Sequence, residues 1–215
     1  MDMRLGQPAP DFEQDTANGS IRFHEWLGSS WCVLVVHPRN FAPVFATEIA
    51  ALARLSSEWD RRDVKIVCLS ADTAESHIEW ASDVEETQGC TIDFPMVADS
   101  DRSVSTLYGV TDLALEGHGV IVIDPAKTVR LVLAYPACTG CNFTEILRAI
   151  DSLQLADARD VATPADWVFG QDVFIAPALS DAEAALRFGG GWTAPRPYLR
   201  VVGQPASAAD RPPTR

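Results

Sequence analysis

Residues 36–48 read Val-His-Pro-Arg-Asn-Phe-Ala-Pro-Val-Phe-Ala-Thr-Glu, and the chain is organised around them. This stretch overlaps the end of an apolar run, residues 31–36, which has the length of a buried strand. Large apolar residues then recur at helical spacing: Phe45, Ile49, Leu52, Leu55 and Trp59. The pattern predicts a strand, a proline-containing turn and a helix that begins near Ala42. The first turn of such a helix carries unpaired backbone N–H groups, which favour an anion or a thiolate.

Strand and helix patterns alternate along the next part of the chain. Residues 20–28, before the stretch, alternate like a half-buried strand that runs into a turn, and residues 64–69 after it form a buried strand. Asp72 with Glu75 three positions later predicts the cap of a helix that extends to about Glu86.

The alternation ends in a hairpin and a last helix. A short strand is expected within residues 91–99, followed by a helix over residues 103–108. The apolar residues 120–123 and 129–135 flank an Asp-Pro pair, which predicts a hairpin. Asn142 then begins a helix whose apolar residues share one face: Phe143, Ile146, Leu147, Ile150 and Leu153. This order is typical of the α/β class and of the thioredoxin-like fold.

The composition is ordinary for a soluble globular protein, with 215 residues of which 47% are hydrophobic and 22% charged. No apolar run is long enough to span a membrane, and residues 1–4 lack the apolar core of a signal peptide. We therefore expect a cytoplasmic protein with no membrane partner. The net charge of −13 disfavours nucleic acid as a partner, because phosphate contacts need a basic surface.

The 36–48 stretch resembles the active-site loop of the peroxiredoxins, and most closely the 1-Cys group with its motif His-Pro-Arg-Asp-Phe-Thr-Pro-Val-Cys-Thr-Thr-Glu. The opening of the chain, residues 5–12, is similar to the start of thioredoxin-fold peroxidases. Residues 161–167, Val-Ala-Thr-Pro-Ala-Asp-Trp, resemble the C-terminal extension of the 1-Cys peroxiredoxins. The resemblance implies a thioredoxin-like core at residues 1–160, with a central mixed sheet flanked by helices.

The resemblance also implies a dimerisation extension at residues 161–202 and therefore a homodimer. Large apolar side chains support a packed extension: Trp167, Val173, Phe174, Ile175, Leu186, Phe188, Trp192 and Tyr198. Three consecutive glycines, residues 189–191, interrupt the pattern and indicate that the extension departs there from its usual course in the family. Residues 203–215 are rich in Pro, Ala and Ser, and we expect them to form a flexible tail.

The groups that carry the family's chemistry are replaced in this chain. In the family loop a Cys is the peroxidatic nucleophile and a Thr helps to hold the peroxide, and the matching positions here are Phe45 and Ala42. Two arginines of the family pocket fall at His118 and Cys141. Four other pocket positions match the family: His37, Pro38, Glu48 and Tyr135. We therefore predict that ordinary peroxidase chemistry is lost.

The replacements make the predicted pocket smaller or more apolar. A thiolate becomes a benzyl ring, a hydroxyl becomes a methyl, and two fixed cations become an imidazole and a thiol. Either Phe45 fills the pocket, or the pocket has been refitted for a small organic ligand with Phe45 as its wall. In the second case His118 is a candidate acid or base. The alternative for His118 is a hydrogen-bonded histidine at a strand edge. His37 and Glu48 are expected to act as scaffold residues.

Neither a metal nor another cofactor is expected. His37, Glu48, His118 and Cys141 show no metal-ligand spacing. The two remaining histidines belong to no motif, and we expect them at the surface: His24 and His77.

The stretch Cys-Thr-Gly-Cys, residues 138–141, has the spacing of thiol-disulfide active sites. It lies at the N-terminus of the Asn142 helix, a position that can lower the pKa of the Cys141 thiol. A thioredoxin carries its CxxC where Phe45 stands here, so Cys138 and Cys141 are either a redox pair or two unrelated thiols.

Three functions follow from these patterns. The first is an enzyme or binding protein that takes an organic metabolite, with His118 and Cys141 as working groups. The second is a catalytically silent pseudoenzyme that acts by binding a protein partner. The third is a thiol redox protein that works through Cys138 and Cys141.

Overall fold

The computed structural model describes residues 4–205, so residues 206–215 of the expected tail lie outside the described residues. The chain divides into two compact units, one that extends to Phe143 and one that begins at Thr144. The resemblance predicts the division at residue 160, after the last predicted helix. That helix groups instead with the C-terminal unit, because its Leu155 belongs to the hydrophobic core of that unit.

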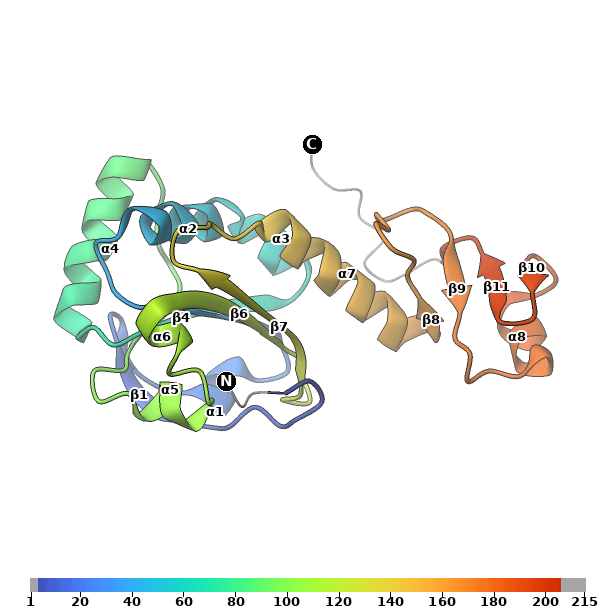
Figure 1. Ribbon diagram of the computed structural model, residues 1–215, viewed down its shortest axis with the longest axis horizontal. Coiled ribbons are helices and arrows are strands. Elements are labelled where there is room, and N and C mark those ends of the chain that lie inside the picture. Colours follow the sequence, from blue (N-terminus) through green and yellow to red (C-terminus); the bar gives the residue numbers. More distant parts are fainter. Residues whose placement is uncertain (1–3, 206–215) are drawn as a thin grey trace. The chain divides into compact units, whose positions relative to one another are not determined.

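A seven-stranded mixed sheet forms the centre of the first unit, in the order β2-β1-β5-β4-β3-β6-β7 (Figure 1). Its strands are β1 (Glu13–Thr16), β2 (Gly19–Arg22), β3 (Trp31–Val36), β4 (Val64–Ser70), β5 (Met96–Ala98), β6 (Gly117–Ile123) and β7 (Val129–Pro136). Strands β3, β4 and β5 are parallel, whereas β6 and β7 form the predicted antiparallel hairpin. The α/β class and the mixed sheet are thereby confirmed.

Helices cover both faces of this sheet, so every residue of β3 is buried. The helices are α1 (Phe23–Leu27), α2 (Pro43–Arg54), α3 (Ser56–Arg61), α4 (Ala74–Gln88), α5 (Ser103–Leu107) and α6 (Leu113–Glu116). Phe23 of α1 and Val104 of α5 share a core cluster with Leu34 of β3. In Figure 1, α2 and α4 lie on the opposite side of the sheet from α1 and α5.

Two local predictions were wrong. The predicted strand over residues 20–28 ends at Arg22, and α1 follows, because Phe23 and Leu27 lie one helical turn apart and are both fully buried. Thr73 rather than Asp72 caps α4, by accepting a hydrogen bond from the Ser76 backbone N–H.

The second unit holds α7 (Phe143–Arg159), which begins directly after Asn142 as predicted, and α8 (Asp181–Phe188). A four-stranded antiparallel sheet has the order β10-β11-β9-β8, with β8 (Val161–Ala162), β9 (Val173–Ile175), β10 (Thr193–Arg196) and β11 (Leu199–Val202). Its small core consists of Leu155, Val161, Trp167 and Val173. Among the described helices of both units, none has the length and apolar character needed to cross a membrane.

Candidate functional site

Helix α2 begins after the loop that leaves the C-terminal end of β3. Phe41 in this loop has a left-handed backbone, with φ 54°, and Ala42 is the N-cap in an extended conformation. Pro43 occupies the first turn, where its missing N–H removes no helical hydrogen bond. Among the described residues no side chain caps the remaining N–H groups of this turn. The N-terminus of α2 therefore keeps its partial positive charge.

Phe45 lies in the first turn of α2 and is only 3% exposed. Its ring centroid is 5.8 Å from that of His37 and 5.1 Å from that of His118, the second contact being edge-to-face. The benzyl ring thus packs between two imidazoles. Phe45 and His118, which the family alignment assigns to one site, are brought together by the fold.

A buried carboxylate lies next to His118. The His118 Nε2 atom is 3.0 Å from Glu48 Oε1, in ion-pair rather than directional hydrogen-bond geometry. The same Glu48 oxygen accepts a hydrogen bond of 2.5 Å from the Cys141 backbone N–H. Since the side chains of His118 and Glu48 are 0% and 4% exposed, water screens their interaction little. Glu48 therefore ties α2 both to β6 and to the loop that holds Cys141.

Tyr135 completes this cluster from β7. The register of the hairpin places it directly opposite His118, and the two rings stack at 5.3 Å with an interplanar angle of 14°. The side chain of Tyr135 also forms a hydrogen bond with Cys141, which favours the thiolate. Burial is the stronger influence, however, and it raises the pKa of the Cys141 thiol to about 11. The Cys141 thiol therefore does not have the lowered pKa that a place at a helix N-terminus allows.

The two cysteines of the CxxC stretch are free thiols in different surroundings, since Cys138 is exposed and Cys141 is half-buried. At neutral pH the Cys141 sulfur is protonated, which makes it a poor nucleophile.

His37 packs against Phe45, and the His77 ring lies next to His37, with ring centroids 6.4 Å apart. His37 is 1% exposed and packs against Trp80, with ring centroids 5.2 Å apart. His77, predicted at the surface, is fully buried, because α4 turns it toward β5, where its Nε2 lies 3.1 Å from the Val97 carbonyl oxygen. Burial, followed by the proximity of His77, lowers the pKa of His37 to about 4. His24, also predicted at the surface, is partly exposed.

A cavity of about 510 Å³ opens at the N-terminus of α2. Its lining consists of Pro38, Arg39, Ala42, Pro43, Val44, Phe45, Arg102, Ala114, Leu115 and Ala137. Three of the predicted pocket residues, Pro38, Ala42 and Phe45, are among them. The two residues predicted to work on a ligand, His118 and Cys141, lie outside this lining. Phe45 packs on His118 and also lines the cavity.

Two arginines of the lining were missed in the sequence. Arg39 belongs to the loop between β3 and α2, whereas Arg102 comes from the turn before α5 and belongs to no local motif. The buried Nη1 atom of Arg102 has no hydrogen-bond partner within the described part of the chain. These two arginines line the cavity, whereas His118 and Cys141, the positions where the family motif has its arginines, do not. Residues 4–205 contain no group of three or more His, Cys, Asp or Glu side chains that could hold a metal ion.

Two family models match the chain. Residues 5–132 match the AhpC/TSA family, and residues 152–191 match the C-terminal domain of 1-Cys peroxiredoxin.

The same relationship appears in whole-chain comparisons. The 1-Cys peroxiredoxin of Dictyostelium discoideum is 44% identical over 207 residues, which cover 94% of this chain and 86% of that protein. Peroxiredoxin-6 of Gallus gallus is 41% identical over 218 aligned positions, which cover 94% of this chain and 97% of that protein.

Solved structures agree in fold. A yeast mitochondrial 1-Cys peroxiredoxin superimposes with a TM-score of 0.89 at 40% identity and covers 94% of this chain and 99% of its own. A cysteine-to-serine mutant of the peroxiredoxin 6 of Arenicola marina gives a TM-score of 0.87 at 37% identity, covering 95% of this chain and 100% of its own. The thioredoxin-like fold is therefore shown, and the chain belongs to the AhpC/TSA family of peroxiredoxins, in which its similarity is to the 1-Cys group.

Proposed function

We propose that this peroxiredoxin-family chain has lost ordinary peroxidase chemistry and binds a small organic anion at the N-terminus of α2. The observation that carries the proposal is the cavity of about 510 Å³ beside a buried Phe45. The family motif places the peroxidatic Cys at this position, and a benzyl ring cannot attack a peroxide. Because the cavity stays open next to the ring, Phe45 is its wall rather than its plug.

The lining of this cavity favours a ligand that combines a negative charge with an apolar body. Arg39 and Arg102 bring two guanidinium groups, and the uncapped first turn of α2 adds partial positive charge. Ala42, Phe45 and Leu115 offer apolar contact. A carboxylate with a short aromatic or aliphatic body satisfies both parts of this lining.

Binding is better supported than conversion. A ligand in the cavity would reach His118 only if the ring of Phe45 moved, since that ring both lines the cavity and packs on the imidazole. The high pKa of Cys141 weighs against the third hypothesis, a redox pair with Cys138. Under this proposal His118 and Cys141 are positioning residues that act through Glu48.

Calorimetry with benzoate, phenylacetate and hexanoate tests the proposal against the neutral amides of the same acids. We expect the carboxylates to bind and the amides to bind at least roughly tenfold more weakly, since each charged hydrogen bond contributes about 1.5–3 kcal/mol. Arg102→Gln should weaken carboxylate binding by a similar factor. Arg196→Gln is the matched control, because that exposed side chain donates to Pro195 far from the cavity lining in sequence. Equal binding of acids and amides would count against an anion site.

A specific observation also favours a partner surface on the second unit. Leu186 and Tyr198 are 87% and 81% exposed, although both are large apolar residues. We propose that they meet a second copy of this chain, so that the protein is a homodimer. Light scattering should show a dimer at micromolar concentration, and the double variant Leu186→Ser with Tyr198→Ser should shift it toward monomer. A monomeric unmodified protein would remove this proposal.

The cytoplasmic location stays a prediction. One relative is, by its name, a mitochondrial protein: peroxiredoxin PRX1 of Saccharomyces cerevisiae.

A further inference from the structure

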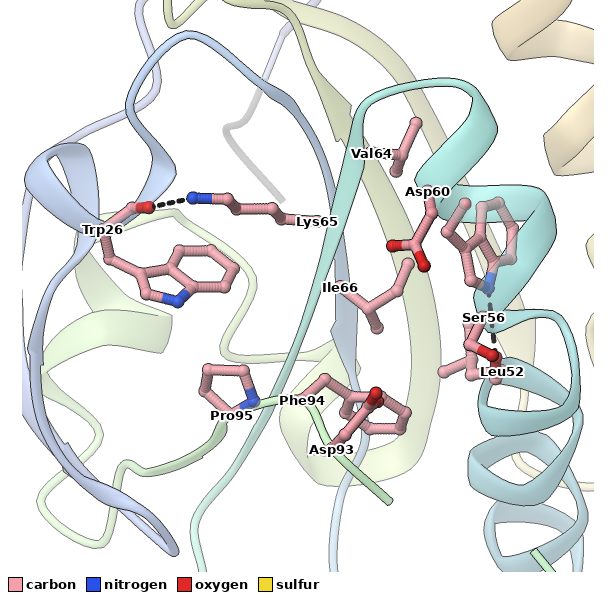
Figure 2. A pocket seen from close by; sticks show the side chains of 11 residues that line it. Trp26, Leu52, Ser56, Asp60, Val64, Lys65, Ile66, Asp93, Phe94 and Pro95 are labelled. Atoms are coloured by element: carbon pink, nitrogen blue, oxygen red, sulfur yellow. Dashed lines mark hydrogen bonds between the residues drawn. The ribbon is translucent and has the colours of Figure 1, made fainter. Parts of the chain in front are cut away.

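A second cavity, of about 230 Å³, lies at the other end of α2 (Figure 2). It is formed where the last turns of α2, helix α3, the start of β4 and the segment before β5 come together. Its lining consists of Trp26, Leu52, Ser56, Trp59, Asp60, Val64, Lys65, Ile66, Asp93, Phe94 and Pro95. No residue of this lining belongs to the cavity at the N-terminus of α2, so the two described cavities are separate.

The floor of this second cavity is apolar. Val64, Ile66 and Phe94 are each less than 9% exposed and pack as core residues. The Trp59 indole N–H donates a hydrogen bond of 3.0 Å to the Leu52 carbonyl oxygen, so its polar atom is already satisfied. The floor therefore offers hydrocarbon and aromatic contact without demanding a polar partner.

Two carboxylates, Asp60 and Asp93, line the cavity from separate segments and are exposed. Within residues 4–205 neither side chain has an ion-pair or hydrogen-bond partner, so both carboxylates are available to a ligand.

The one cation of the lining is directed elsewhere. Figure 2 shows Lys65 and Trp26 on one side of β4, and Asp60, Val64 and Ile66 on the other. The Lys65 Nζ donates a hydrogen bond of 2.5 Å to the Trp26 carbonyl oxygen and lies 5.2 Å from the centre of the Trp26 ring. Since Lys65 is held in this way, its charge does not neutralise Asp60 and Asp93 by direct pairing.

From these observations we infer that the second cavity is a binding site for an organic cation, namely an ammonium or guanidinium group on a short apolar stem. The stem packs on Ile66 and Phe94, and the charged head reaches the carboxylates of Asp60 and Asp93. The volume of about 230 Å³ is below that of a pocket for a drug-sized ligand, and it suits a group the size of a lysine or arginine side chain. Such a group is supplied either by a free amine or by a basic side chain of another protein.

Titration of the full chain with n-butylammonium, n-butylguanidinium and neutral n-butanol tests the inference, with NMR shifts and tryptophan fluorescence as readouts. We expect both cations to shift signals of Trp59 and Phe94, and n-butanol to bind at least roughly tenfold more weakly. The double variant Asp60→Asn with Asp93→Asn should weaken cation binding by a similar factor. Because both side chains are exposed and without partners in the described structure, the variant should fold, and circular dichroism checks this.

The net charge of −13 attracts any cation, so the specific effect needs a control of equal charge change. Glu79→Gln removes one exposed carboxylate on α4 that does not line the cavity, and it is matched by the single variant Asp93→Asn. Glu79→Gln should leave cation binding unchanged. The inference is overturned if Glu79→Gln weakens binding as much as Asp93→Asn, if the double variant binds normally, or if n-butanol binds as well as the cations.

A second titration, with N-acetyl-lysine methylamide, distinguishes a free amine from a basic side chain of another protein. Binding that matches n-butylammonium supports a basic side chain of a protein as the occupant. Binding of n-butylammonium alone supports a free amine, because the flanking amides of a peptide then do not fit. Either result is independent of the anion cavity, since the residues varied here do not line it.

Discussion

The two cavities of the first unit lie at opposite ends of α2 and carry opposite charge. The N-terminal cavity has Arg39 and Arg102 in its wall, whereas the C-terminal cavity has Asp60 and Asp93. Both contain apolar residues, which in the first cavity come from helices and loops and in the second include Val64 and Ile66 of β4. Under our two proposals the thioredoxin-like scaffold supplies the cavities, and a few charged residues from loops and helix ends determine which ligand fits each one.

Under our proposal, ancestry and activity are separate at the first cavity. This cavity lies beside the stretch that resembles the family's active-site loop, and we propose that the groups of that motif which carry peroxide chemistry are replaced at Phe45, Ala42, His118 and Cys141. The C-terminal cavity has no counterpart in the motif. Family membership therefore predicts the place of the first cavity and says nothing of the second.

The largest expected effect concerns peroxide. The unmodified protein should show no thiol-dependent consumption of hydrogen peroxide above the blank in stopped-flow assays, because position 45 holds a benzyl ring. Phe45→Cys should recover little, since Ala42 cannot bond the peroxide and the neighbouring His118 is already engaged by Glu48. The matched variant is Phe41→Cys, which places a thiol on the same loop at an exposed position. Family-like turnover by the unmodified protein would contradict the proposed loss of function.

The next effect is on stability. His118→Ala removes the partner of the buried Glu48 carboxylate and opens a hole beside Phe45 and Tyr135. We expect the free energy of unfolding to fall by about 3–5 kcal/mol, as measured by urea denaturation. His24→Ala, at a partly exposed histidine, should lower it by less than about 1 kcal/mol. If Glu48→Gln is added to His118→Ala, part of the loss should be recovered, because no buried charge is then left alone. A loss from His118→Ala no larger than that from His24→Ala would show that the pair is not coupled.

A somewhat smaller effect depends on pH. Burial lowers the pKa of His37 from 6.5 to about 4 in the folded chain, so folding favours the neutral imidazole. The stability that this histidine contributes is full above pH 6.5 and declines as the pH falls toward 4. The shift corresponds to a loss of about 3 kcal/mol when both states are protonated. Urea denaturation between pH 7 and pH 4 should show the decline, and His37→Gln should flatten it. His77, whose pKa is also lowered by burial, contributes in the same direction.

These residues show what the sequence predicts and what it leaves out. The strand at residues 31–36, the helix after it and the hairpin are visible because apolar spacing and turn residues are local properties. The Glu48, His118 and Tyr135 positions were found only through the family motif. His77 and Arg102 were missed, since nothing in their neighbouring residues tells that α4 buries the first and that the turn before α5 brings the second to a cavity.

The second cavity was missed for the same reason. Asp60 and Asp93 belong to no motif in the sequence, and only the contacts of α3 with β4 and of β4 with β5 place them around one cavity. A local sequence pattern does not predict which distant segments come together, and the segments that form this cavity are separated by complete helices and strands. The negative charge around this cavity therefore depends on the fold and not on a local sequence pattern.

The smallest expected effect is the coupling between the two cavities. Helix α2 has 12 residues, so the cavities at its ends are separated by about 18 Å. A bound carboxylate and a bound ammonium at roughly this distance attract each other by about 0.2 kcal/mol in water, which is less than a twofold change in affinity. Titrating n-butylammonium with and without saturating benzoate should therefore give dissociation constants within twofold, with the small gain present at low salt and screened at about 0.15 M. Direct competition between the two ligands would instead mean that both occupy one cavity, and the assignment of opposite charge to the two ends of α2 would then fail.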